Sequence, residues 1–167
     1  MLLALGREMI DYIGARVKRI TDAEAREEAQ FRAFFAFLVE HPEFYRVLHE
    51  ADQFAPDAYR QHLEYVEHGY LRLFRRMRGR GQVADFDDRT FEVIAYVLMA
   101  ARDYLGTRYA LKNGRVQPVP DWVVDAYMGL LRHGLFARPQ SAADGDGDAA
   151  EPEPPRDSTW AGQQTQP

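Results

Sequence analysis

The chain has 167 residues, no cysteine and a formal net charge of −5 at neutral pH. This length suits one domain with a hydrophobic core, and the absence of cysteine excludes disulfides, zinc–thiolate sites and thiol catalysis. The negative charge argues against nucleic-acid binding by the chain as a whole, and no run approaches the roughly eighteen apolar residues of a membrane span. We therefore expect a soluble, cytoplasmic protein with no membrane partner.

Helical periodicity runs through most of residues 1–136 and predicts an all-α fold of six helices, because no segment shows the alternation of a strand. The first helix, about Leu2 to Arg19, carries an apolar stripe at three- and four-residue steps. At the start of the second helix, Thr21 and Glu24 have the spacing of a capping box. Phenylalanines follow on one side of this second helix.

Two prolines mark the starts of the third and fourth helices. Pro42 and Pro56 each suit the first helical position, where the missing N–H loses no needed hydrogen bond. The fourth helix repeats apolar residues at alternating four- and three-residue steps, which predicts one continuous contact with its neighbours. Gly79 and Gly81 are expected to end this helix.

The last two helices are the most apolar part of the chain. Asp87 can cap the fifth helix, and residues 91–105 are apolar around nearly the whole circumference, which predicts burial on more than one side. A KNG turn and a loop around Pro118 follow. The sixth helix runs to His133, and Gly134 suits a left-handed C-cap.

The C-terminal segment has a different composition. From Ala137 onward it is rich in Pro, Gly, Asp and Glu, and Trp160 is its only large apolar residue. Such a segment buries too little apolar surface to offset its ordering entropy. We predict a helical domain over residues 1–136 and a disordered acidic, proline-rich tail over residues 137–167, which folding does not require.

The order of these segments is similar to that of a known family. The phenylalanine-rich helix is followed by HPEFYRVLHEA, APDAYRQHLEYV, GRGQVADFD, the mostly apolar YVLMAARDYLGTRYAL and a closing RHGLF. From about Leu2 to Phe136 the chain resembles the C-terminal ligand-binding and dimerisation domain of TetR/AcrR-family transcriptional regulators. The resemblance implies a six-helix regulatory domain with an effector cavity and a dimer.

Members of that family begin with a DNA-binding head that contains a helix-turn-helix. Only twenty residues precede Thr21, and residues 1–20 resemble the single helix that links the head to the sensor. We therefore expect DNA contact only through a helix-turn-helix that is absent from this chain. A truncation, a late start codon and a genuinely headless protein each explain that absence.

Catalytic and metal-binding motifs are missing from the sequence. No two of the five histidines stand three or four residues apart, the spacing that places two ligands on one helix face. The Glu-x-x-His motif of di-iron bundles and the signatures of hydrolases, nucleotide-binding loops and metalloproteases are also absent. We expect no enzymatic activity, no catalytic residue, no metal and no cofactor.

The basic run RLFRRMRGR, from Arg72 to Arg80, has two interpretations. Its arginines could bind phosphate, on DNA or on a nucleotide-bearing ligand such as an acyl-CoA. Alternatively, they complement the macrodipole at the end of a helix and are balanced by Asp85, Asp87 and Asp88. We favour the second interpretation, since such charges usually lie on a solvated helix face.

Aromatic residues provide the candidate ligand site. Most of them are expected to fill the core, but tyrosine and histidine bring polar groups that need partners when buried. A pocket between helices, lined by rings and a few polar groups, accepts a mostly hydrophobic ligand. The resemblance places such a cavity among the helices that begin near Asp22, Pro42, Pro56 and Asp87. The predicted ligand-binding residues are Phe34, Phe35, Leu38, Tyr45, His49, Tyr59, His62, Leu63, Val66, Tyr70, Tyr96 and Met99.

The last two helices carry more apolar surface than one face can bury within a monomer. A two-fold partner would cover this surface in a four-helix contact, an arrangement similar to the dimer of the family. The predicted dimer-interface residues are Leu98, Ala101, Arg102, Leu105, Trp122, Val123, Tyr127, Leu130 and Leu131. The alternative is a monomer in which the loop around Pro118 or the first helix covers these faces.

The sequence thus predicts the effector-binding and dimerisation domain of a TetR-like regulator that senses a small hydrophobic or amphipathic ligand. The main alternative is a headless interaction module that pairs with complete regulators. A third possibility is a helical enzyme of unknown type, which a conserved buried ion pair or a bound metal would favour.

Overall fold

The computed structural model describes residues 1–134, and within them the fold is all-α with six helices, as the sequence predicted. The predicted tail, residues 137–167, lies outside the described residues. The helices are α1 (Leu2–Val17), α2 (Ala23–Glu40), α3 (Pro42–Phe54), α4 (Pro56–Gly79), α5 (Asp88–Leu105) and α6 (Asp121–His133). Between α5 and α6 lie a π-helical turn (Gly106–Ala110) and two short strands, β1 (Leu111–Lys112) and β2 (Arg115–Val116).

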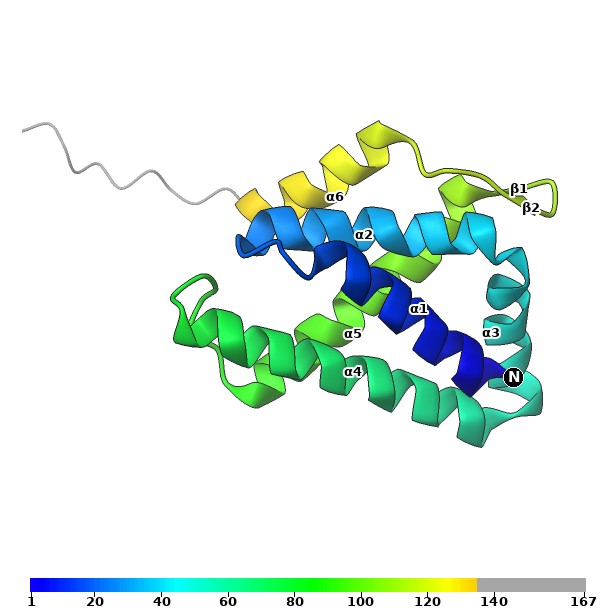
Figure 1. The fold of residues 1–167 in the computed structure, drawn as a ribbon, viewed down its shortest axis with the longest axis horizontal. Helices are drawn as coiled ribbons and strands as arrows, with labels where there is room; N and C mark the ends of the chain where they lie inside the picture. The colour runs from blue at the N-terminus through cyan, green and yellow to red at the C-terminus, as the bar shows by residue number, and fades with distance from the viewer. Residues whose placement is uncertain (135–167) are drawn as a thin grey trace, which may run out of the picture. The chain divides into compact units, whose positions relative to one another are not determined.

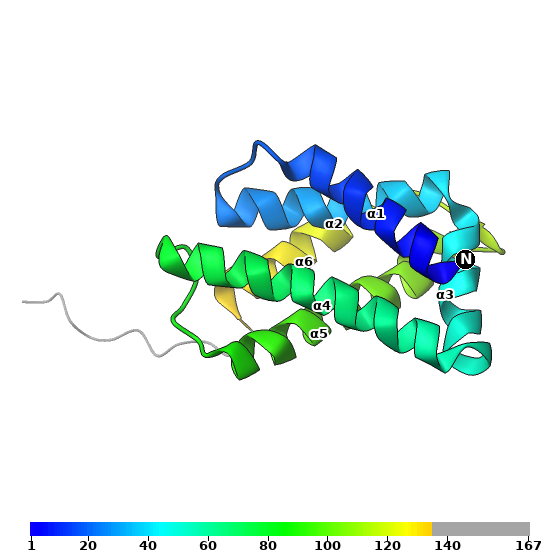
Figure 2. The ribbon, with the colours of Figure 1, turned by 60° about the horizontal axis from the view of Figure 1, so that its bottom comes forward.

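The helices pack around α2 and α4. The first helix, α1, lies across both of them, and α3 joins the end of α2 to the start of α4 (Figure 1). The α5 helix packs on α4, and α6 packs on α2 (Figures 1 and 2). This arrangement sets α1, α2, α4 and α5 around one interior space.

Short polar side chains fix where two helices begin. The backbone N–H of Ala25 donates to the Asp22 carboxylate at 2.8 Å, so α2 is capped by Asp22 and the predicted capping box at Thr21 is wrong. Asp87 caps α5 as predicted, because its carboxylate accepts the N–H of Thr90 at 2.8 Å. Asp22 lies one residue after Thr21 and offers the stronger acceptor for the free N–H groups of the first turn.

Prolines and a glycine fix other helix ends as predicted. Pro42 and Pro56 are the first residues of α3 and α4. Gly134 ends α6 with a φ of 72° and a ψ of −180°, so the helix ends where predicted, but in an extended positive-φ conformation open to glycine and not in the left-handed helical one.

The segment between α5 and α6 contains a small hairpin that the sequence did not predict. Asn113 and Gly114 have φ values of 52° and 73°, which suits a two-residue turn between antiparallel strands. The sequence predicted the turn but no strands, because strands of two residues are too short to show an alternating pattern.

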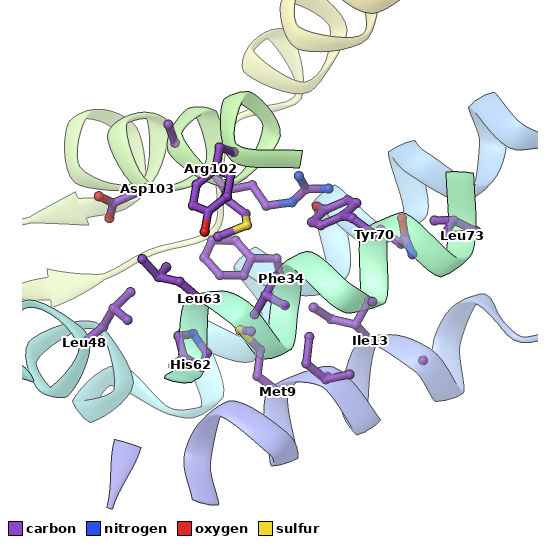
Figure 3. A pocket seen from close by; sticks show the side chains of 18 of the residues that line it. Met9, Ile13, Phe34, Leu48, His62, Leu63, Tyr70, Leu73, Arg102 and Asp103 are labelled. Atoms are coloured by element: carbon purple, nitrogen blue, oxygen red, sulfur yellow. The ribbon is translucent and has the colours of Figure 1, made fainter. Parts of the chain in front are cut away.

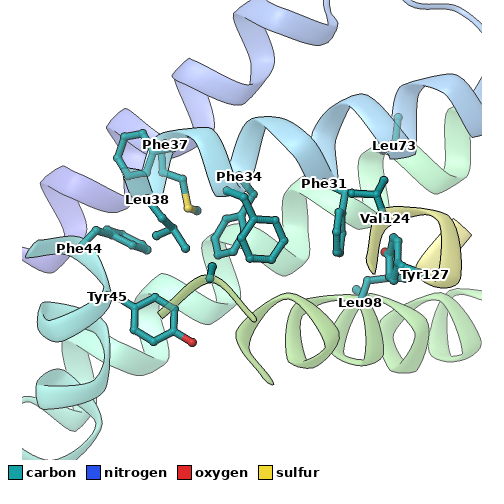
Figure 4. Packing of buried hydrophobic residues seen from close by; sticks show 14 of the residues in the cluster. Phe31, Phe34, Phe37, Leu38, Phe44, Tyr45, Leu73, Leu98, Val124 and Tyr127 are labelled. Carbon is teal, nitrogen blue, oxygen red and sulfur yellow. The ribbon is translucent and has the colours of Figure 1, made fainter. Parts of the chain in front are cut away.

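Phenylalanines of α2 form the centre of the core (Figure 4). Phe31 stacks on Tyr127 of α6 with ring centroids 4.1 Å apart, which ties α6 to α2. Phe37 packs edge-on against Tyr12 of α1 and Phe44 of α3, at centroid distances of 5.4 and 5.5 Å. One helix therefore holds three others through stacked and edge-to-face ring contacts.

The predicted burial of α5 on more than one side is wrong for a single chain. Val93, Val97 and Tyr104 are 63%, 60% and 76% exposed. Phe91, Ala95 and Leu98, in contrast, are buried in the core. The apolar residues of α5 lie around the helix as the sequence indicated, but the rest of the chain covers only one side of it.

Candidate functional site

A cavity of about 600 Å³ lies between α1, α2, α4 and α5 and reaches α3 at one end. Its wall follows α4 from Tyr59 to Arg76, a length of about 25 Å at the helical rise of about 1.5 Å per residue. Figure 3 shows Leu48 and Asp103 toward one end of this space and Leu73 toward the other. The cavity is therefore elongated, and its volume lies within the range typical of small-molecule sites.

Most of the cavity wall is apolar, with contributions from each of the surrounding helices. Met9 and Ile13 come from α1, Phe34 from α2, Val66 from α4 and Met99 from α5. Such a wall favours a ligand with a large apolar part, because burial of apolar surface drives its binding.

Two glycines widen the space between α1 and α4. Gly14 and Gly69 both line the cavity, and a Cβ atom built on either would find no other atom within 4 Å beyond its immediate chain neighbours. The helices therefore do not need glycine at these positions for close packing, and the missing side chains leave room in the cavity.

Nine of the twelve predicted ligand-binding residues lie on the cavity wall. They are Phe34, His49, Tyr59, His62, Leu63, Val66, Tyr70, Tyr96 and Met99. The structure brings them together from α2, α3, α4 and α5, the four helices that the sequence assigned to the cavity.

The other three predicted ligand-binding residues belong to the core and do not line the cavity. Phe35 and Leu38 are 1% and 0% exposed because they point from α2 into the packed core. The Tyr45 hydroxyl donates to the backbone oxygen of Asp103 at 2.6 Å and also bonds the Thr107 hydroxyl, so its polar group is already satisfied. Burial raises the pKa of Tyr45 to about 12.

One whole wall of the cavity was not predicted. Residues Met9, Ile10, Ile13, Gly14 and Val17 of α1 line it, although the sequence placed the cavity only among the later helices. Their apolar stripe was the available signal, but periodicity alone does not tell whether a stripe faces packed atoms or open space. The cavity lining also includes polar residues that the sequence did not assign to it, among them Arg26, Gln30, Arg72 and Arg76 at one end and Asp52 and Asp103 at the other.

His62 of α4 lies directly against Gly6 of α1. It is only 4% exposed, and a Cβ atom on Gly6 would lie 2.4 Å from its Nδ1 atom, so glycine is required at this contact. Burial lowers the pKa of His62. The imidazole is therefore neutral at pH 7, which suits an apolar cavity wall.

A buried ion pair closes the cavity on the side of α5. The Arg102 side chain donates from Nη2 to the Glu27 carboxylate at 2.6 Å and from Nη1 to the Leu98 oxygen at 3.1 Å. The Tyr127 hydroxyl donates to the same Glu27 oxygen at 2.6 Å. Burial opposes the charge on Arg102 while the Glu27 carboxylate favours it, and the pKa of Arg102 is raised overall.

A buried ion pair was one of the two features that would favour the third possibility, a helical enzyme. Its charged groups already have partners from the chain, and burial raises the pKa of Tyr127 and of the neighbouring Tyr70, which keeps both phenols protonated. Neither phenol can act as a base near neutral pH. The geometry is that of a structural contact between α2, α5 and α6.

The predicted dimer-interface residues divide into two groups. Leu98, Arg102, Val123 and Tyr127 are at most 6% exposed, so the prediction that they lie on a dimer surface is wrong. Leu98 and Tyr127 belong to the core of the single chain, and Arg102 and Tyr127 both bond Glu27 of α2. The remaining residues keep an outward part: Ala101 and Leu105 are half-buried, and Trp122, Leu130 and Leu131 are exposed.

Two further features bear on the type of site. Among residues 1–134, no group of three or more histidine, aspartate or glutamate side chains comes close enough to hold a metal ion. In the same part of the chain, none of the helices combines the length and the apolar character needed to cross a membrane.

No model of a known protein family and no curated protein matches this sequence. The family resemblance therefore rests on the sequence segments quoted above.

Proposed function

We propose that this chain is the effector-binding and dimerisation domain of a TetR-like transcriptional regulator, and that it senses a small hydrophobic or amphipathic ligand. One observation carries the proposal: an elongated, mainly apolar cavity of about 600 Å³ with α1 as one of its walls. The resemblance identifies α1 as the helix that links the sensor to a DNA-binding head.

The position of α1 provides a mechanism. A ligand in the cavity contacts Met9 and Ile13 of α1 and Val66 of α4 at the same time. Any ligand that fits one spacing of these helices better than another shifts the population toward that spacing. A head attached to the N-terminal end of α1 would move with the helix, so that ligand and DNA binding are coupled.

Gly69→Leu is expected to abolish binding of a neutral apolar dye without loss of stability. The new side chain enters open space beside the cavity, since a Cβ at this position meets no atom within 4 Å other than the nearby backbone of its own helix. Replacing a helical glycine also favours the helix by up to about 1 kcal/mol. The measurement is a fluorescence titration with N-phenylnaphthylamine, together with a thermal melt.

The matched control is Gly79→Leu on the same helix. Gly79 is also exposed to open space, but it does not line the cavity. Dye binding that is saturable in the wild type, retained in Gly79→Leu and lost in Gly69→Leu supports the proposal. Equal binding by both variants, or no saturable binding by the wild type, contradicts it.

The exposed apolar residues of α5 and α6 support the homodimer. Val97 and Tyr104 on α5 and Trp122 and Leu130 on α6 are each more than half exposed, and large apolar side chains left open to water favour a partner that covers them. A second copy that covers them would bury on the order of 1,200 to 2,000 Å² in total.

Val97→Glu and Leu130→Glu are expected to dissociate the dimer with helicity retained. Both side chains point outward, so a charge there is compatible with the folded monomer but not with a dry interface. Light scattering at tens of micromolar and circular dichroism measure the two properties. A charge at Leu98 would be a poor test, because this residue is 4% exposed and the variant would unfold.

The alternative function, an interaction module that pairs with complete regulators, uses the same exposed surface. The light-scattering experiment distinguishes the two. A wild-type chain that is monomeric at tens of micromolar contradicts the homodimer and favours pairing with another protein.

A further inference from the structure

One end of the cavity carries a cluster of guanidinium groups. Arg26 from α2 and Arg72 and Arg76 from α4 line this end, and Arg80 directly follows the last residue of α4. Arg72 and Arg76 are four residues apart and therefore lie on one face of the helix. This arrangement gathers positive charge beside a space whose remaining wall is mostly apolar.

Other arginines of the same basic run have acidic partners. Arg75 binds Asp88 at 2.9 Å, and Arg78 lies 3.9 Å from both Asp85 and Asp88. Among residues 1–134, by contrast, no carboxylate lies within 4 Å of Arg26, Arg72, Arg76 or Arg80. Our interpretation that the aspartates balance the whole run is therefore wrong: they balance only the two arginines on the other face of α4.

Arg26 is held in place toward the cavity. Its Nη1 atom donates to the backbone oxygens of Val17 and Ile20, both at 3.0 Å, which anchors it to the end of α1. Its Nε atom is buried and has no hydrogen-bond partner. Burial lowers the pKa of Arg26, and the nearby charges of Arg76 and Arg80 lower it further. An anion placed here would relieve this repulsion.

Gln30 adds a neutral polar group at the same end. It lies four residues after Arg26 on α2, so the two side chains are neighbours on one helix face. Its Oε1 atom is buried and lacks a hydrogen-bond partner, although it lines the cavity. Buried polar atoms are rarely left in this state, and a hydroxyl or N–H group of a bound molecule, next to its anionic group, would donate to this oxygen.

We propose that Arg26, Arg72 and Arg76 bind the anionic group of an elongated amphipathic ligand, a carboxylate or a phosphate ester. Its apolar chain then lies along α4 past Val66 toward the end at Leu48. Guanidinium groups form charge-assisted hydrogen bonds with both kinds of anion. This assignment rests on the proposed sensor function and adds the chemical class of the ligand.

The test compares probes with the same chain and different end groups. Decanoate, decanol and decylammonium compete with the neutral dye N-phenylnaphthylamine for the wild-type chain. Decanoate is expected to bind about tenfold or more tightly than decanol, because hydrogen bonds to a charged group contribute more than neutral ones. Decylammonium is expected to bind more weakly than decanol, since like charges repel.

The double variant Arg72→Gln/Arg76→Gln is expected to lose most of the preference for decanoate while it still binds decanol. The control is Arg60→Gln, because Arg60 lies on the same helix, is exposed and does not line the cavity. This control should keep the wild-type preference. A preference that survives in the double variant overturns the assignment of these arginines.

The experiments distinguish failure of the anion site from failure of the proposed sensor function. Equal affinity of the wild type for decanoate and decanol overturns the anion site, while saturable decanol binding that Gly69→Leu abolishes leaves the cavity function standing. Absence of saturable binding by the dye and by all three probes contradicts both proposals.

Discussion

Arg102→Met is expected to lower the free energy of unfolding by about 3 to 5 kcal/mol, because it leaves the Glu27 carboxylate buried without its counter-charge. The side chains of this pair are only 7% and 13% exposed. Glu27 would keep one hydrogen bond, from the Tyr127 hydroxyl, which cannot neutralise the charge. Urea denaturation followed by circular dichroism measures the change.

Two controls separate burial from the loss of an ion pair as such. Arg132→Met breaks the Arg132–Glu24 pair, whose side chains are 40% and 62% exposed, and should cost at most about 1 kcal/mol. The double variant Arg102→Met/Glu27→Gln should recover part of the lost stability, since the buried charge is then absent. If Arg102→Met costs no more than Arg132→Met, the pair is not buried in solution.

Phe37→Ala is also expected to cost about 3 to 5 kcal/mol, the range for removal of a large aromatic side chain from a core. Phe37 is 0% exposed, and its ring contacts Tyr12, His41 and Phe44. Its loss leaves a hole where α1, α2 and α3 meet, and neighbouring side chains fill such holes only partly. Chemical denaturation again provides the measurement.

Phe54→Ala is the matched control for this substitution. Phe54 is on α3 and is 81% exposed, so its removal should change stability by less than about 0.5 kcal/mol. A similar loss of stability in both variants would mean that Phe54 is covered, by a partner or by another part of the chain. Such a result would contradict the conclusion that Phe37, and not Phe54, belongs to the core.

Helix positions followed well from the sequence because their signals are local. Pro42, Pro56, Asp87 and Gly134 each fix a helix end through their own backbone or side-chain chemistry. The shift of the first helical cap to Asp22 shows the limit of this approach. Adjacent residues can both offer an oxygen, and the path of the backbone decides which one is used.

The cavity could be predicted only in part from the sequence, because its lining depends on which helix faces meet in the folded chain. Tyr45 and Tyr59 both place a phenol on an apolar helix face, yet the first bonds Asp103 and Thr107 and the second lines the cavity. The run from Arg72 to Arg80 poses the same problem. Only the tertiary structure shows that Arg75 and Arg78 pair with aspartates, whereas Arg72 and Arg76 line the cavity.

Gly14 and Gly69 have a consequence for how the ligand range of this domain can evolve. Since neither glycine is needed for packing, larger residues there reshape the cavity without disturbing the phenylalanine core. Selectivity and stability are then controlled by different positions in the sequence. Homologous domains can therefore diverge in the molecules they recognise, through single substitutions at these two sites, while they keep the same helical framework.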